Sequence, residues 1–247
     1  MGIDWSIDTF DSLNSTQDLA KEMGRMNEPE GKVVHAFQQK KGTGRHGRPW
    51  ISDYGNLYLS LLLRPNCKAK QVTEFSLLTA IAAADTIERY MQEPQKLTLK
   101  WPNDILIEGK KCAGILLETE LSQSGAVKWL AIGFGLNVNK APPDMGVGIQ
   151  DYSEQILDLI TLRNRFLENM ARMYAIWDTQ NFDVIRRKWL EKAHKKGTPM
   201  EIRLGVQIER GYFHDLDPSG NLVLRDGDYR TKTISAGEVH FLDKESF

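Results

Sequence analysis

The stretch KKGTGRHGRPWISDYGNLYLSLLL, residues 40–63, decides which fold this 247-residue chain adopts. Its first half spells G-x-G-x-x-G with Gly42, Gly44 and Gly47. That spelling marks a dinucleotide-binding loop only where a strand precedes it and a helix follows. A β-rich run over residues 32–37 does precede it, but the loop leads through a polar turn into a second strand-like run, residues 57–63. The sequence therefore disfavours a Rossmann fold.

The charges inside this loop indicate what it binds. No Gly-Lys-Ser or Gly-Lys-Thr ends it, so it is not a P-loop. Arg45 and Arg48 lie among glycines that expose backbone N–H groups, and this combination suits a carboxylate or a phosphate. A mobile glycine-rich surface loop is the alternative interpretation. We expect the loop to be mobile and its cations to lack partners until an anion binds, and we expect His46 to be exposed and non-catalytic.

Composition limits the classes of protein to consider. Hydrophobic residues make up 41% and charged residues 26%, as in a soluble globular protein, and a net charge of −1 gives no overall attraction for nucleic acid or anionic membranes. No apolar run is long enough to span a bilayer, and residues 1–10 lack the pattern of a signal peptide. Two cysteines, Cys67 and Cys112, are too few for a disulfide framework. We therefore expect a cytoplasmic protein.

The periodicity of the chain predicts an α/β part followed by a β-rich end. Helices are expected directly after Ser15-Thr16 and over residues 72–91 and 153–193. Strands are expected over residues 97–101, 105–107, 113–121 and 127–138, with a hairpin turn at 108–111. After a change of composition at residues 194–199, short alternating segments predict a small β-barrel. We predict an α+β fold with a mixed central sheet in a catalytic domain, residues 1–195, and a barrel domain, residues 196–247.

A second cationic cluster lies in KWPNDILIEGKKCAGILLE, residues 100–118. Residues 101–104 are expected to form a turn between strands, and Lys110, Lys111 and Gly114 follow. Either lysine alone is most simply a solvated surface residue. Together with the arginine loop, the cluster indicates a site for a pair of anionic substrates, surrounded by cations and glycines.

These stretches together resemble the biotin protein ligases, the enzymes that attach biotin to a lysine of biotin-dependent carboxylases. Five motifs occur in the family's order and spacing: Gly44-Arg45-His46-Gly47-Arg48-Pro49-Trp50, Asn56-Leu57-Tyr58-Leu59-Ser60, Lys100-Trp101-Pro102-Asn103-Asp104, Lys111-Cys112-Ala113-Gly114-Ile115-Leu116-Leu117-Glu118 and Gly133-Phe134-Gly135-Leu136-Asn137. The resemblance covers almost the whole chain. It implies the biotin–lipoate ligase fold, which is like that of class II aminoacyl-tRNA synthetases, with an SH3-like C-terminal barrel.

The resemblance also implies roles for particular residues. Positions that bind biotin in the family correspond to Ser15, Thr16, Gln39, Gly42, Arg45, Lys111, Gly114, Gly133 and Gly135. Positions that bind ATP correspond to Arg45, Arg48, Trp50, Asn56, Lys111 and Asn137. Asp104 corresponds to a position close to Mg²⁺, and catalysis is implied for Lys111, Arg45 and Arg48.

The implied reaction makes biotinyl-5′-adenylate and pyrophosphate from biotin and ATP, and a lysine of a biotin carboxyl carrier protein then takes the acyl group. The first step brings a carboxylate to a polyanionic phosphate, and burial strengthens their repulsion. The three cations Lys111, Arg45 and Arg48 would offset this repulsion, with Mg²⁺ bridging phosphate oxygens. Because such catalysis is positioning and electrostatic stabilisation without a covalent enzyme intermediate, Cys112 is expected to pack as a small apolar group.

Three positions depart from the family pattern: Gln17 replaces an asparagine, Thr43 a frequent arginine, and Leu242 an arginine that some members carry. Ser15-Thr16 lies near the start of the sequence, which leaves no room for the family's N-terminal DNA-binding domain, so we expect no DNA binding. The protein is expected to be a monomer or a homodimer. Two alternatives stay open. One is a lipoate or octanoate ligase or transferase of the same fold, and the other is an inactive module that only binds biotin.

Overall fold

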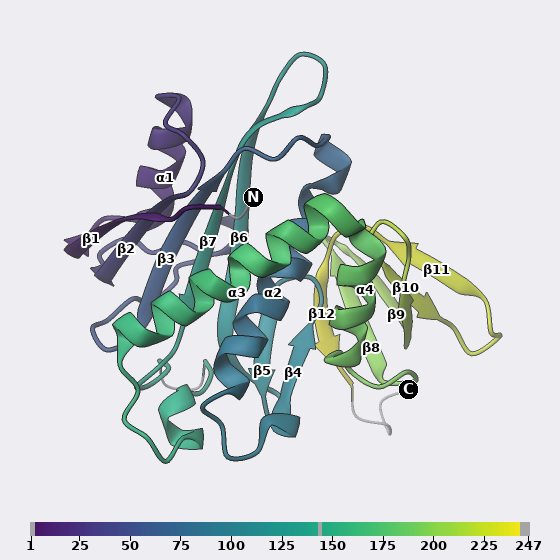
Figure 1. The fold of residues 1–247 in the computed structure, drawn as a ribbon. Helices are drawn as coiled ribbons and strands as arrows, with labels where there is room; N and C mark the ends of the chain where they lie inside the picture. Colours follow the sequence, from purple (N-terminus) through teal and green to yellow (C-terminus); the bar gives the residue numbers. More distant parts are fainter. Residues whose placement is uncertain (1–2, 143–144, 243–247) are drawn as a thin grey trace.

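The computed structural model describes residues 3–142 and 145–242, and the larger of its two sheets has seven strands in the order β1-β2-β3-β7-β6-β5-β4 (Figure 1). The strands are β1 (Ser6–Leu13), β2 (Lys32–Gln39), β3 (Leu57–Leu63), β4 (Leu97–Lys100), β5 (Asp104–Ile107), β6 (Lys110–Leu121) and β7 (Val127–Leu136). The pair β1–β2 is parallel and the other neighbours are antiparallel. The sheet is therefore mixed, as predicted.

Helices pack on both faces of this sheet (Figure 1). The α-helices in the described part of the chain are α1 (Thr16–Arg25), α2 (Val72–Glu88), α3 (Leu159–Gln180) and α4 (Phe182–Glu191). Short 3₁₀ helices are η1 (Arg45–Gly47), η2 (Ala69–Gln71), η3 (Pro94–Lys96) and η4 (Ile149–Tyr152). Helix α1 contacts β2, β3 and β7, whereas α2 contacts β4, β5 and β6 and packs against α3 and α4. The fold class is therefore α+β.

Strand β3 is buried on both faces, as its nearly continuous apolar run predicts. Successive side chains of a strand point to opposite faces. Leu61 packs in the cluster that contains Phe75 of α2, whereas Leu62 packs in a smaller cluster with Ala20 of α1. Ser60 therefore shares the face of Leu62, the face that carries α1. The site described below lies on this face.

The C-terminal segment forms a second, five-stranded antiparallel sheet with the order β11-β10-β9-β8-β12. Its strands are β8 (Pro199–Leu204), β9 (Gln207–Leu216), β10 (Leu222–Arg225), β11 (Thr231–Ile234) and β12 (Glu238–Phe241). This agrees with the small barrel that the alternating segments predict. Ile202 and Phe213 belong to the same hydrophobic cluster as Phe75 of α2, so the two sheets share one core.

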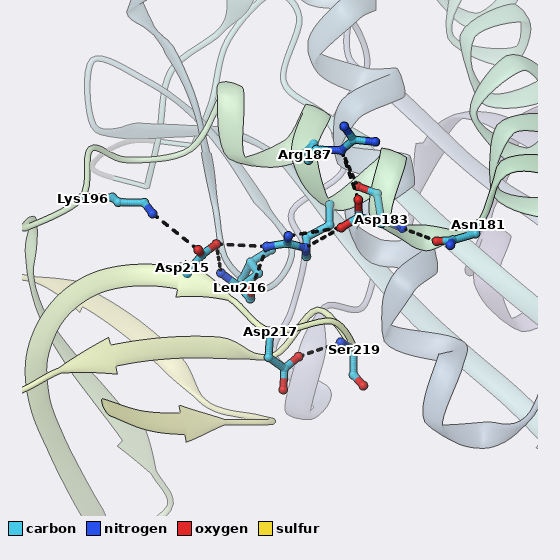
Figure 2. A network of polar contacts seen from close by, with 9 residues as sticks. Asn181, Asp183, Arg187, Lys196, Asp215, Leu216, Asp217 and Ser219 are labelled. Atoms are coloured by element: carbon cyan, nitrogen blue, oxygen red, sulfur yellow. Dashed lines mark hydrogen bonds and ion pairs between the residues drawn. The ribbon is translucent and has the colours of Figure 1, made fainter. Parts of the chain in front are cut away.

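A polar network also ties α4 to this sheet (Figure 2). Asp215 of β9 forms an ion pair with Lys196 at 3.4 Å and another with Arg186 of α4 at 3.2 Å. Arg186 also donates to the carbonyl of Leu216 at 3.0 Å and pairs with Asp183 of its own helix. Figure 2 shows Asp215 between Lys196 and the helix. The second sheet is thus fixed to the helical layer by charge as well as by apolar packing.

Two features of the fold differ from the sequence-based expectation. Strand β1 was not predicted, because its sequence SIDTFDSL does not alternate strictly between apolar and polar residues. The expected helix over residues 153–193 starts only at Leu159 and is interrupted at Asn181, which has φ 74°. That conformation cannot continue an α-helix, and the Asn181 side chain instead caps α4 by accepting from the N–H of Asp183 at 2.7 Å.

Within the described ranges no helix is both long and apolar enough to cross a membrane. The division of the chain into domains 1–195 and 196–247 stays a prediction. Its boundary coincides with the segment between α4 and β8, the first strand of the second sheet.

Candidate active site

A cavity of about 490 Å³ lies on the α1 face of the seven-stranded sheet. Part of its floor is backbone, because Gly133 and Gly135 of β7 and Gly114 of β6 carry no side chains there. Gly114 pairs with Gly135 across the two strands. A Cβ at Gly133 would lie 2.8 Å from Gln17 Oε1, and one at Gly135 would lie 2.6 Å from Trp50 Nε1. These glycines therefore leave the space that Gln17 and Trp50 occupy.

One end of the cavity is lined by uncharged polar side chains from α1, β2 and β3. Gln39 Oε1 accepts from the Thr16 N–H at 2.8 Å and from the Thr16 hydroxyl at 3.0 Å. Thr16 Oγ1 lies 2.9 Å from Ser60 Oγ, and the Ser60 hydroxyl donates to Gln17 Oε1 at 3.1 Å. We call Thr16, Gln17, Gln39 and Ser60 the neutral end. Because Thr16, Gln17 and Ser60 are buried, hydrogen bonds made here act without competition from bulk water.

The opposite end, which we call the charged end, carries Lys100, Lys111, Arg45, Arg48, Asp104 and Glu238. Lys111 Nζ lies 2.5 Å from Asp104 Oδ1, and Lys100 Nζ lies 3.6 Å from Asp104 Oδ2. Two lysines thus share one carboxylate, which leaves an excess of positive charge facing the cavity. Glu108 and Gly109, which both have positive φ, form the turn between β5 and β6. Lys110 and Lys111 are therefore the first two residues of β6, and as successive residues of a strand they point to opposite faces, which leaves Lys111 on the side of the cavity.

The glycine–arginine loop folds back on itself beside the charged end. The Trp50 N–H donates to the Gly42 carbonyl at 2.8 Å, and the Gly44 N–H donates to the Arg48 carbonyl at 2.7 Å. His46 and Gly47, at the tip, both have positive φ. No helix follows the loop, and β2 and β3 pair antiparallel, so the Rossmann interpretation is excluded.

The expectation that the arginines lack partners was wrong. Arg45 Nη1 donates to Asn103 Oδ1 at 3.0 Å, and both terminal nitrogens lie 3.4 Å from the Gly237 carbonyl. Arg48 makes two bonds of 2.6 Å to Glu238, so this guanidinium holds the pKa of the Glu238 carboxyl at about 2. Asn103 lies 58 positions further along the chain, and Gly237 and Glu238 lie about 190 positions further along it, so the local sequence pattern could not reveal these partners.

Trp50 covers part of the floor. Its ring would contact a Cβ at Gly114 or Gly135, and Lys111 Nζ lies 5.2 Å from the ring centroid, within the range of a cation–π contact. Trp50 Nε1 is buried without a hydrogen-bond partner. A buried donor without a partner is unusual in a folded protein and indicates that a ligand can supply the acceptor.

The other residues that the resemblance implies divide into two groups. Ser15 and Asn137 line the cavity, and the Oδ1 atom of Asn137 is buried without a partner. Gly42 and Asn56 do not line it. Asn56 accepts from the N–H groups of residues 138 and 139 and donates to the Lys140 carbonyl, so it holds the chain that follows β7.

Four further expectations concern single residues. Cys112 is fully buried, its S–H donates to the Ile105 carbonyl at 3.4 Å, and burial raises its thiol pKa, so it packs as expected. His46 is exposed, as expected. Thr43 is also exposed, and its hydroxyl donates to the Lys41 carbonyl. Leu242 follows β12 and donates its N–H to the Pro199 carbonyl.

The described residues do not form a metal site by themselves. No group of three or more His, Cys, Asp or Glu side chains is close enough within them to hold a metal ion. Asp104 is a single carboxylate whose two oxygens already face lysines. Magnesium is commonly held by one or two carboxylates and by substrate phosphates. A Mg²⁺ ion carried only by this chain does not fit the residues present.

Among the polar side chains that line the cavity, sequence reasoning gave no role to Ser60, Lys100, Asn103 and Glu238. The first three lie inside motifs that the sequence showed, but a motif does not tell which of its side chains point into a cavity. Glu238 lies beyond every motif of the large sheet. No local signal could have found it.

Comparisons with known proteins identify the family of this chain. The family model for the biotin/lipoate A/B protein ligase family matches residues 9–137, just over half of the chain. A biotin–[acetyl-CoA-carboxylase] ligase of Paracoccus denitrificans is 36% identical over 221 residues, which cover 84% of this chain and 89% of the relative. The bifunctional ligase/repressor BirA of Bacillus subtilis is 33% identical over 234 residues, which cover 92% of this chain and 71% of the relative.

The fold is shared with solved structures as well. A biotin protein ligase from Aquifex aeolicus, in complex with biotin and ATP, superimposes with a TM-score of 0.81 at 24% identity and covers 96% of this chain and 98% of its own. That level of identity establishes the fold, and the matches in sequence establish the kinship. The chain belongs to the biotin/lipoate A/B protein ligase family.

Proposed function

We propose that this chain is a biotin protein ligase, which activates biotin with ATP and transfers it to a lysine of a biotin carboxyl carrier protein. The observation that favours biotin is that the neutral end has fewer hydroxyl hydrogens than it has short contacts between oxygen atoms. Thr16 Oγ1–Gln39 Oε1, Thr16 Oγ1–Ser60 Oγ and Ser60 Oγ–Gln17 Oε1 are three short contacts, but the two hydroxyls provide only two hydrogens.

The two amide groups do not supply the missing hydrogen. Gln39 Nε2 donates to Ser52 at 3.0 Å, and Gln17 Nε2 donates to the Ala131 carbonyl at 3.3 Å. A ligand with N–H donors satisfies such a cluster, whereas an apolar ring leaves its acceptors unpaired. The ureido ring of biotin carries two N–H groups and the dithiolane ring of lipoate carries none. This supports biotin over lipoate or octanoate as the substrate.

The charged end supports the activation step. The biotin carboxylate attacks the α-phosphorus of ATP, the bond between the α- and β-phosphates breaks, and pyrophosphate leaves. Lys111 and Arg45 would bind the carboxylate and α-phosphate oxygens, and Arg48, once released from Glu238, would bind the phosphates that leave. Trp50 and Asn137 would contact the adenosine. Magnesium would enter with the ATP phosphates, and Asp104 and Glu238 are the carboxylates that line the cavity among the described residues.

In the second step the neutral ε-amine of the carrier lysine attacks the acyl carbon of biotinyl-adenylate. The bond between the acyl carbon and the phosphate oxygen breaks, AMP leaves with its electron pair, and the proton released from the amine passes to water. The neutral end and the glycine floor would hold the biotin ring still while the mixed anhydride faces the opening. Residues that bind biotin would then be Ser15, Thr16, Gln39, Gly114, Gly133 and Gly135, together with Arg45 and Lys111 at its carboxylate.

The deciding experiment is detection of the intermediate by mass spectrometry. The protein is mixed with ATP and Mg²⁺ and with biotin, lipoate or octanoate. We expect biotinyl-5′-adenylate alone. A lipoyl- or octanoyl-adenylate without the biotin product would instead favour the alternative ligase. Tight biotin binding without any adenylate would leave only the inactive binding module.

The partner and the setting are part of the same proposal. A cytoplasmic location fits the free, buried Cys67 and Cys112. A monomer or homodimer stays a prediction. Absence of DNA binding stays a prediction, and a mobility-shift assay with the operator of a carrier gene checks it.

A further inference from the structure

Ser52 is a buried polar residue that the proposed reaction does not use. It lies between the glycine–arginine loop and β3, with 4% of its surface exposed. It does not line the cavity, so it contacts no ligand there. Its main-chain carbonyl accepts from the N–H of Gln39 at 3.1 Å, which joins it to the end of β2.

The hydroxyl of Ser52 connects two residues that line the cavity. It donates to the Trp50 carbonyl at 2.8 Å and accepts from Gln39 Nε2 at 3.0 Å. Because a hydroxyl has only one hydrogen, donation to Trp50 leaves Ser52 an acceptor toward Gln39. Gln39 therefore turns Nε2 to Ser52 and Oε1 to Thr16 and the neutral end. The same bond pair thus fixes the orientation of the Gln39 amide and the position of the Trp50 backbone.

Packing around this connection is tight. A Cβ at Gly42 would lie 2.4 Å from Ser52 Oγ, 2.4 Å from the Trp50 carbonyl and 3.2 Å from Gln39 Nε2. The Gly42 carbonyl also accepts the Trp50 N–H. Since Gly42 does not line the cavity, its missing side chain is explained by this close approach rather than by contact with a ligand. The Ser52 hydroxyl is therefore enclosed on the side of Gly42. A movement of the Gln39 amide would displace this hydroxyl and, with it, the hydrogen bond to the Trp50 carbonyl.

We propose that Ser52 is a positioning residue. It couples the binding of a ligand at the neutral end to the placement of Trp50, which the proposed function assigns to nucleotide binding. The inference rests on the proposed function, because the two ligands are taken to be biotin and ATP. A ligand N–H that replaces the Thr16 hydroxyl at Gln39 Oε1 holds the amide in this orientation, which holds Ser52 and then the Trp50 carbonyl. By linkage, a nucleotide that needs Trp50 in this place tightens biotin by the same factor by which biotin tightens the nucleotide.

The coupling factor is measured by titration calorimetry. Biotin is titrated into the full-length protein with Mg²⁺, with and without α,β-methylene-ATP, whose α–β bridge cannot be cleaved. The coupling factor is the ratio of the two dissociation constants. We expect Ser52→Ala to reduce this factor about fivefold, the equivalent of one hydrogen bond. Ser52→Thr keeps the hydroxyl and should retain most of the factor.

Two further variants separate coupling from stability. Thr119→Val removes a hydroxyl-to-carbonyl bond of the same kind, from Thr119 to the Trp129 carbonyl on β6 and β7, outside the cavity. It should lower the melting temperature without changing the coupling factor. Gly42→Ala keeps the Ser52 hydroxyl, but its Cβ would lie 2.4 Å from both Ser52 Oγ and the Trp50 carbonyl, so it should separate this pair and lose coupling as Ser52→Ala does. It carries the test if Ser52→Ala does not fold.

The outcomes are distinct. Unchanged coupling in Ser52→Ala, or in Gly42→Ala where the first variant does not fold, overturns the role of Ser52. Wild-type protein that binds both ligands without coupling overturns it too, while the proposed function survives. Wild-type protein that does not bind biotin overturns the proposed function, and this inference with it.

Discussion

The two ends of the cavity recognise their ligands by different physical means. The neutral end has four uncharged side chains, which α1, β2 and β3 supply from the first 60 residues. The charged end gathers its ions from the glycine–arginine loop, from β4 to β6, and from β12 near the end of the chain. Hydrogen bonds at the first end depend on exact donor and acceptor positions, while charges at the second act over longer distances. Specificity should therefore reside at the neutral end and rate at the charged end.

The largest expected effect tests the charged end. Lys111→Ala removes the cation that faces Asp104 and the cavity, while the adjacent Lys110 is exposed on the other side of the strand. We expect biotin-dependent ATP–pyrophosphate exchange to fall about 100- to 1000-fold, equivalent to about 3 to 4 kcal/mol of transition-state stabilisation. Lys110→Ala is the matched control and should keep near-normal exchange. Near-normal exchange in Lys111→Ala would show that Lys111 does not stabilise the transition state of adenylate formation.

Arg45 should have the next largest effect, on retention of the adenylate. Burial lowers the pKa of this guanidinium, although Asp104 and Glu238 oppose the shift, so it remains a cation within the site. Loss of charge-assisted bonds worth about 1.5 to 3 kcal/mol should speed escape of biotinyl-adenylate roughly 10- to 100-fold. Arg45→Ala should then label other proteins promiscuously, as a streptavidin blot shows, and Arg187→Ala, which changes an exposed arginine of α4 outside the cavity, should not. Equal labelling by both variants would contradict this role.

The neutral end is tested by affinity rather than rate. Thr16→Val keeps the shape of the side chain but removes the hydroxyl that lies between Gln39 and Ser60. We expect the dissociation constant for biotin to rise about tenfold, because buried acceptors lose a partner. The dissociation constant for the ATP analogue alone should stay the same. Thr119→Val, which removes a hydroxyl bound to the Trp129 carbonyl outside the cavity, serves as the control. If both constants change equally in Thr16→Val, the two ends are not separate.

The smallest effect concerns the scaffold and its response to pH. His35 of β2 is fully buried, and burial together with the nearby Arg163 lowers its pKa from 6.5 to about 4. The unfolded chain therefore takes up the proton first. The contribution to stability is complete above pH 6.5 and is lost as the pH falls toward 4, by about 1 kcal/mol per pH unit.

Urea unfolding at pH 7, 6 and 5 measures this slope. His35→Gln should flatten it, while His46→Gln, at an exposed position, should leave it unchanged. His194 has a pKa lowered to about 4 by burial as well, so part of the slope should remain in His35→Gln. If His35→Gln keeps the full wild-type slope of stability against pH, His35 is not responsible for that slope. The neutral end contains no ionisable side chain, so biotin affinity should not follow the same curve.

Much of the fold could be predicted where a local pattern has only one good solution. Strand β3 was predicted with its bounds because its apolar run can only be covered on both faces. The Glu108–Gly109 turn followed from turn chemistry. Strand β1 and the break at Asn181 were missed, because pairing and capping by neighbours override a weak local pattern there.

The candidate site was predictable to a similar degree. Thr16, Gln39, Arg45 and Lys111 line the cavity as the family pattern suggested. Asn56, by contrast, holds a neighbouring segment although its motif adjoins the site. A motif records that a residue is required. It does not record whether the side chain contacts a ligand or supports one that does.

The sequence by itself determined the family, the α+β class and the chemistry of the loop. Each of these depends on residue types at short spacing, which backbone geometry translates directly into local structure. Only the tertiary structure decided that Glu238 pairs with Arg48, that two lysines share Asp104, and that Ser52 joins Gln39 to Trp50. Such contacts join segments distant in sequence, or depend on which way a side chain points, and the packing of the whole chain sets both.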